Sequence, residues 1–136
     1  MPKPRANDAE LDKIARFERI KKAITVLEKQ QAIILRQGAL APQGAWVARY
    51  QVRQNLKKYW YYKLQASTPC LPQATSSKLS KYKHLGKAGT TEHIDAVMSV
   101  FRRSIWEEIQ RIIDTLDDCL LDISSGSEQE EEDPQD

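Results

Sequence analysis

The chain has 136 residues, of which 40% are hydrophobic and 29% charged, so it can form one soluble domain with a modest core. It contains no apolar run near the roughly 18 residues of a membrane span, no apolar stretch typical of a secretory signal, and only two cysteines, so we expect a cytoplasmic protein without a disulfide framework. The net charge of +2 conceals an asymmetry, because residues 29–91 hold eleven Lys/Arg and no acid, whereas residues 92–136 hold three Lys/Arg and fourteen Asp/Glu.

The first predicted element is a helix from Asp8 to Gln37, after a flexible amino terminus of residues 1–7. Asn7 or Asp8 can cap the helix, and Gly38 is suited to end it. Apolar side chains recur at seven-residue spacing and form one stripe. This stripe includes Ile20, Leu27 and Ile34.

A three-stranded antiparallel sheet is predicted between about residues 45 and 87, where the hydrophobic period changes to two. The runs "AWVARYQVR" and "YWYYKLQAS", joined by a turn in "QNLKK", form a hairpin. The stretch from Thr68 to Ser80 is rich in Pro, Ser and Thr and predicts a flexible loop. "KYKHLGK", residues 81–87, is the third strand.

A second long helix begins after Thr90 or Thr91 and ends near residue 123. The acidic residues 124–136 contain no hydrophobic residue and predict a disordered tail. The fold class is therefore α+β, with a single helix–sheet–helix domain over residues 8–123. No internal repeat is found.

The two helices carry more apolar surface than a small sheet can cover. We expect them to pack on each other, either within one chain or across a homodimer in the manner of a coiled coil. The candidate interface residues are Ile20, Leu27, Ile34, Ile105, Ile112 and Leu116.

Strand alternation divides the aromatic cluster "YWYY" between two faces. Trp60, Tyr62 and Leu64 are expected to face the helices, together with Trp46, Tyr50 and Val52 of the first strand. The outer face would then combine tyrosines with cations. The candidate nucleic-acid contacts are Arg49, Gln51, Arg53, Lys57, Lys58, Tyr59, Tyr61, Lys63, Lys81, Lys83 and Lys87.

The alternative interpretation of this face is an ordinary solvated sheet surface, since tyrosine suits half-buried strands and edge lysines oppose aggregation. A solvated face normally mixes charges of both signs, however, whereas contacts with phosphates favour one sign. The absence of any acid over residues 29–91 therefore favours nucleic-acid binding.

The sequence offers little for catalysis or for a cofactor. His84 and His93 with Cys70 and Cys119 match no zinc-ligand spacing, and we expect no metal. A glycine-rich phosphate loop and a paired nucleophile and base are also missing. We therefore expect a protein that is not an enzyme.

The segments "YWYYKLQ" and "KYKHLGKAGTTEHIDAV" resemble the amino-terminal, arm-type DNA-binding domains of phage and transposon integrases over about residues 45–105. This resemblance implies a three-stranded sheet that enters the DNA major groove, with Arg49, Arg53, Tyr61, Lys63, Lys81 and Lys83 as contacts. Recombinase activity is not implied, because the chain has a long helix before the sheet and no catalytic domain after it. The hairpin is equally similar to small uncharacterised bacterial proteins with a "WV-RY … YWYY" pattern.

Two functions are consistent with these patterns. The first is an accessory or regulatory protein that binds nucleic acid, expected to be DNA, through the sheet, while the acidic tail competes with phosphates or recruits a basic protein partner. The second is a structural or adaptor protein that oligomerises through its helices and grips an acidic or basic protein.

Overall fold

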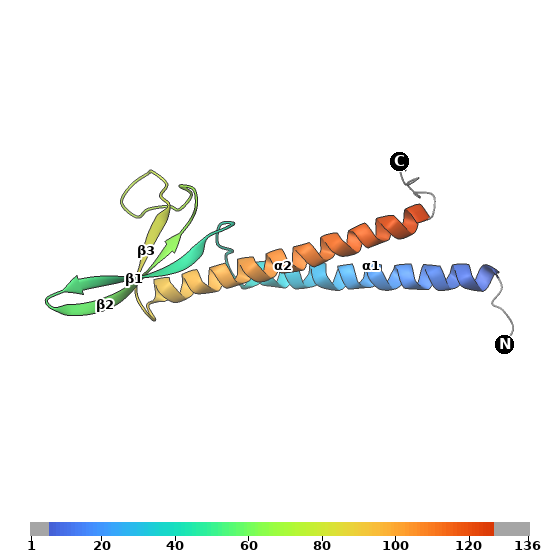
Figure 1. The fold of residues 1–136 in the computed structure, drawn as a ribbon, viewed down its shortest axis with the longest axis horizontal. Coiled ribbons are helices and arrows are strands. Elements are labelled where there is room, and N and C mark those ends of the chain that lie inside the picture. The colour runs from blue at the N-terminus through green and yellow to red at the C-terminus, as the bar shows by residue number, and fades with distance from the viewer. Residues whose placement is uncertain (1–5, 127–136) are drawn as a thin grey trace, which may run out of the picture. The chain divides into compact units, whose positions relative to one another are not determined.

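The computed structural model describes residues 6–126, with side chains from residue 8, and confirms the α+β prediction (Figure 1). Its elements are α1 (Ala6–Gln37), β1 (Trp46–Gln54), β2 (Lys57–Gln65), β3 (Tyr82–Lys87) and α2 (Thr91–Ser125). Helix α1 thus begins inside the predicted flexible end, and α2 continues into the predicted tail. Residues 1–5 and 127–136 lie outside the described residues. Within the described residues, neither helix is long and apolar enough to cross a bilayer.

The chain divides into two compact units, of which the first contains residues up to 33 and from 108 onward. Ile24 and Ile113 are its buried apolar side chains. Gln31 is also buried, and its Nε2 donates to Oε1 of Gln110 at 3.1 Å. A satisfied polar pair among apolar side chains favours one pairing of the two helical segments over shifted ones.

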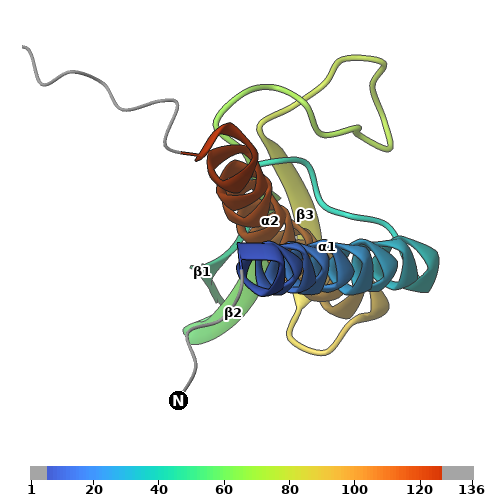
Figure 2. The ribbon, with the colours of Figure 1, turned by 90° about the vertical axis from the view of Figure 1, so that its right-hand side faces the viewer.

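The second unit, Ile34–Glu107, contains the whole sheet and the first part of α2. The strand order is β1-β2-β3, and Figure 2 shows the segment between β2 and β3 as a long excursion from the strands. A buried apolar cluster lies between one face of the sheet, this excursion and α2. It consists of Leu64, Ala66, Leu71, Leu85 and Ala96, with Val47, Tyr62 and Val100 packed against it.

The start of α2 is fixed to the sheet by hydrogen bonds and a ring contact. The Thr90 hydroxyl accepts from the backbone N–H of His93 at 3.1 Å, as in an N-cap, and donates to the carbonyl of Leu85 at 2.7 Å. His93 accepts from the N–H of Gly89 and stacks on Tyr62 with a centroid separation of 3.9 Å. Thr90, rather than Thr91, therefore caps α2.

The hairpin register corrects the predicted faces of the sheet. Tyr50 pairs with Tyr61 and Arg49 with Tyr62, and directly paired residues share a face. Tyr62 and Leu64 face α2 as predicted, but β1 contributes its odd-numbered residues to that face. The prediction that Trp46, Tyr50 and Val52 join the core was therefore wrong, as was the core position of Trp60, which is 46% exposed.

The register follows from a two-residue turn. Asn55 and Leu56 connect the strands with φ of 50° and 65°, the positive values that a type I′ hairpin turn requires at both positions. Because Gln54 then pairs with Lys57, every even residue of β1 lies beside an odd residue of β2. Pairing with β3 shifts by one residue between Tyr62 and Lys63.

Candidate nucleic-acid interface

The sheet face away from the buried cluster carries a group of rings and cations that we call the aromatic face. It consists of Tyr50, Tyr59, Tyr61, Lys63, Tyr82, His84 and Lys87. The rings of Tyr50 and Tyr61 are stacked across the β1–β2 pair, with centroids 6.0 Å apart and planes at 28°. All three strands contribute to this surface, and its side chains are half-buried or exposed.

Two lysines of the aromatic face lie over tyrosine rings. The Nζ of Lys63 is 5.4 Å from the Tyr50 ring centroid and 4.6 Å from that of Tyr82. The Nζ of Lys87 is 4.8 Å from the Tyr59 ring centroid. These distances fall within the range of cation–π attraction. These contacts hold the lysine charges close to the tyrosine rings, so an anionic aromatic ligand could contact a lysine and a ring at the same time.

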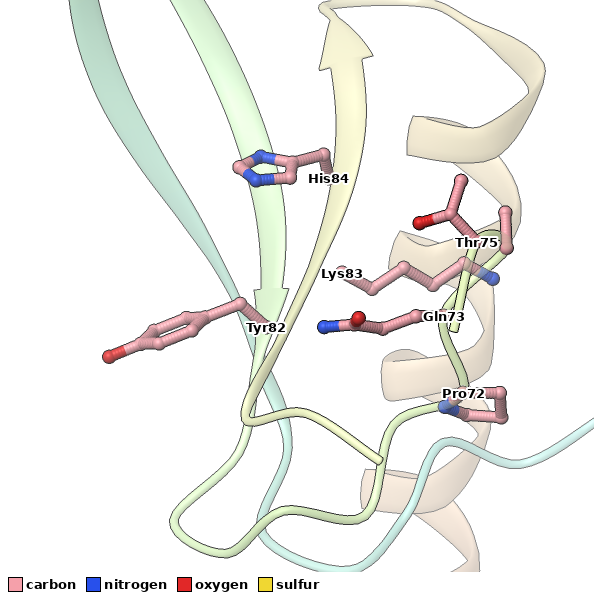
Figure 3. A pocket seen from close by; sticks show the side chains of 7 residues that line it. Pro72, Gln73, Thr75, Tyr82, Lys83 and His84 are labelled. Carbon is pink, nitrogen blue, oxygen red and sulfur yellow. The ribbon is translucent and has the colours of Figure 1, made fainter. Parts of the chain in front are cut away.

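The irregular pairing of β3 decides which of its side chains reach the aromatic face. His84 lies beside Lys63, and Lys87 lies beside Tyr61. Both β3 residues therefore share the aromatic face, although an even-numbered and an odd-numbered residue of a regular strand would lie on opposite faces. The Tyr50 hydroxyl and His84 Nδ1 are 3.0 Å apart. Figure 3 shows His84 and Tyr82 projecting to one side of β3 and Lys83 to the other. All three residues line a pocket of about 320 Å³, together with Pro72, Gln73, Ala74 and Thr75.

The opposite face of the hairpin also carries exposed cations, both beside β3 and where the hairpin extends beyond it. The Arg49 guanidinium lies 4.0 Å from the Trp60 ring centroid. Arg53 is directly opposite Lys58, and both are exposed. The last pair with β3 is Tyr61 with Lys87, so residues 51–60 form a two-stranded ribbon, which we call the hairpin arm.

The predicted nucleic-acid contacts therefore divide between two faces rather than sharing one. Lys57, Tyr59, Tyr61, Lys63 and Lys87 are on the aromatic side, whereas Arg49, Gln51, Arg53, Lys58 and Lys83 are on the side that holds the buried cluster. Lys81 is exposed and precedes β3, and its carbonyl accepts from the N–H of Ala66. The predicted single basic face was wrong for two reasons. The two-residue turn puts the odd-numbered residues of β1 on the side of the buried cluster, and the register of β3 places His84, not Lys83, beside Lys63.

Three members of the aromatic face were missing from the predicted contacts, namely Tyr50, Tyr82 and His84. Tyr50 was assigned to the core, and His84 was considered only as a metal ligand. The available signal was the length of the turn: with Asn55 and Leu56 alone between the strands, Tyr50 pairs with Tyr61. The side of His84 depends on the β3 irregularity, which the alternation pattern does not indicate.

The structure shows how exposed the predicted interface residues of the two helices are in a single chain. Ile20, Leu27 and Ile34 on α1 and Ile105 and Leu116 on α2 are half-buried in the single chain. Ile112 is 41% exposed. A separate exposed apolar group lies on the first turns of α2, formed by Ile94, Val97, Met98 and Phe101.

The fold and its surface define an α+β protein with a basic, aromatic, three-stranded sheet and a projecting hairpin arm. No model of a known family, no curated protein and no solved structure matches the chain. Among residues 6–126, no three His, Cys, Asp or Glu side chains gather in a way that could hold a metal ion.

Proposed function

We propose that this protein binds nucleic acid, specifically duplex DNA, through the hairpin arm and the adjoining aromatic face. In this proposal it is a non-enzymatic cytoplasmic accessory or regulatory factor. The observation that carries the proposal is the distribution of charge on the arm: cations lie on both faces of a two-stranded ribbon that has no acid.

This distribution has a cost for the free protein. Arg53 and Lys58 are direct cross-strand partners, and like charges in that position destabilise a sheet. Lys57 adds a third charge at the same end, while the nearest acids in sequence are Glu28 and Glu92. A polyanionic ligand removes this repulsion, whereas a surface that only needs solubility would gain from mixed signs.

A groove of duplex DNA suits cations on both sides of a ribbon, because phosphates line both of its walls. The major groove is wide enough for a two-stranded β-ribbon, and strands are also used in the minor groove. Tyr59 and Tyr61 are then placed to contact the sugar–phosphate backbone at the base of the arm, together with Lys87 over the Tyr59 ring and Lys63 over the Tyr50 ring.

An equilibrium titration with a fluorescent, mixed-sequence duplex tests this proposal. Five or six phosphate contacts predict a log–log dependence of the association constant on salt with a slope of about −5. Affinity should therefore fall about 10³-fold between 50 and 200 mM salt. A failure to bind at low salt, or binding with a slope near zero, would contradict the proposal.

We further propose that a second copy of the chain covers the exposed apolar group of Ile94, Val97, Met98 and Phe101. Two arms related by symmetry would contact neighbouring sites on one duplex. Light scattering at micromolar concentration should give about twice the chain mass of 15.6 kDa, and Phe101→Lys should halve it. If the unmodified protein is a monomer, the dimer proposal is wrong. This apolar surface would then be available to a protein partner, as in the structural or adaptor alternative.

The acidic residues 128–136 lie outside the described residues, and their proposed role depends on charge alone. They include six acids and no base. We propose that they compete with phosphates for the basic sheet or recruit a basic protein partner.

A further inference from the structure

Leu56 is the apolar tip of an otherwise polar and basic hairpin arm. Its side chain is fully exposed, with a relative accessibility of 106%. Arg53, Lys57 and Lys58 surround it in the sequence and are exposed as well. A large apolar side chain at such a tip buries no surface in the described chain and so contributes nothing to its core.

The backbone at Leu56 makes this choice of residue more unusual. Its φ of 65° lies in the left-handed region, where residues other than Gly, Asn and Asp are disfavoured. Type I′ turns select Asn-Gly for this reason, and Asn55 fits that pattern whereas Leu56 does not. The position therefore carries both backbone strain and exposed apolar surface, a combination that suggests a function at the tip.

We propose that Leu56 is a wedge that inserts between base pairs of duplex DNA from the minor groove and bends the duplex. This inference rests on the proposed binding of duplex DNA by the arm. Apolar side chains such as leucine perform this role in proteins that kink DNA, where they partly unstack one base step.

The dimensions of the arm are compatible with this insertion. Four residue pairs, from Gln51–Trp60 to Gln54–Lys57, extend past the last pair with β3. At about 3.3 Å per residue the arm projects about 13 Å, more than the minor-groove depth of about 7.5 Å. A two-stranded ribbon is wider than the undistorted minor groove of about 6 Å, so the groove must open for entry. Unstacking by a wedge opens it.

The charges on the arm would hold the tip in this position. Arg53 and Lys58 lie on one face of the ribbon, and Lys57 lies on the other. Each face thus presents a cation to one phosphate wall of the groove. An anionic lipid surface would also bind a leucine flanked by cations. It presents a single layer of charge, however, so it would not need cations on both faces of the arm.

The test uses the full-length protein and a short duplex with 2-aminopurine at central steps and a donor and acceptor dye at its ends. The unmodified protein should raise the 2-aminopurine fluorescence and bring the two dyes closer together. At a protein concentration that saturates the duplex, Leu56→Gly should lose both signals, whereas Leu56→Met should keep them. Leu56→Gly is expected to keep the fold, because glycine relieves the positive φ, and an unchanged circular dichroism spectrum with an equal or higher Tm would show this.

The outcomes separate this inference from the proposed function. Binding by the unmodified chain without either signal, or equal signals from Leu56→Gly, would overturn the wedge and leave DNA binding intact. Absence of duplex binding by the unmodified chain would overturn both. If instead Leu56→Gly abolishes binding to vesicles of anionic phospholipid while DNA signals do not change, the tip is a membrane contact and the wedge is wrong.

Discussion

Replacing Arg53, Lys57 and Lys58 with Glu should weaken duplex binding by at least about 100-fold at moderate salt. The change removes three cations from the end of the hairpin arm and adds three anions facing the same phosphates. All three side chains are exposed, so the circular dichroism spectrum should not change. Fluorescence anisotropy with a labelled duplex measures the effect.

A matched control on α1 distinguishes local contacts from net charge. Lys13, Lys22 and Lys29 are exposed, and replacing them with Glu changes the net charge by the same amount. This control should lower the affinity by less than about tenfold, because it leaves every cation of the hairpin arm in place. Equal losses in the two triple variants would mean that binding follows net charge and not the arm.

Leu71→Ala should lower the free energy of unfolding by about 2 to 5 kcal/mol. Leu71 is 1% exposed, although it lies between β2 and β3 outside any strand. Reciprocal backbone hydrogen bonds of 2.9 Å with Ser80 fix its position, and its side chain belongs to the buried cluster. Truncation leaves a cavity that the surrounding sheet and helix can only partly fill. Urea denaturation should show a lower midpoint with an unchanged m value.

Leu79→Ala is the control for this substitution, because it makes the same chemical change in the same segment at a side chain that is 56% exposed. Its cost should be below about 0.5 kcal/mol. Trp60→Ala should also cost less than Leu71→Ala, despite the larger ring, since Trp60 is half-exposed. A larger loss from Trp60→Ala would restore the original assignment of Trp60 to the core.

The elements of this fold could be predicted because each has a strong local signal. Apolar residues at three- and four-residue steps predict α2, and the change to a period of two at Ala45 predicts the sheet. Pro and Ser between Thr68 and Ser80 mark the break before β3. The same signals gave no information about Leu71, since the reason for its burial is a contact with residues distant in sequence.

The composition of the candidate site was only partly predictable. Charge and aromatic content indicate the strands that carry the aromatic face, and every basic residue proposed there is exposed or half-buried. The predicted division into faces was wrong because alternation shows which residues of one strand share a face, but not which residues of the neighbouring strand lie on that face. The pairing of β1 with β2 depends on the turn at Asn55 and Leu56. An exposed leucine with positive φ does not resemble the usual sequence of a two-residue hairpin turn.

Mapping backbone amide signals of isotope-labelled protein by NMR during titration with a mixed-sequence duplex tests binding through the hairpin arm. Such binding should give the largest shifts at residues 51–60, smaller shifts at Tyr61, Lys63 and Lys87, and none in the segment of α1 before Ile33. Saturating duplex that leaves the signals of residues 51–60 unchanged, or that shifts only helical residues, would contradict it.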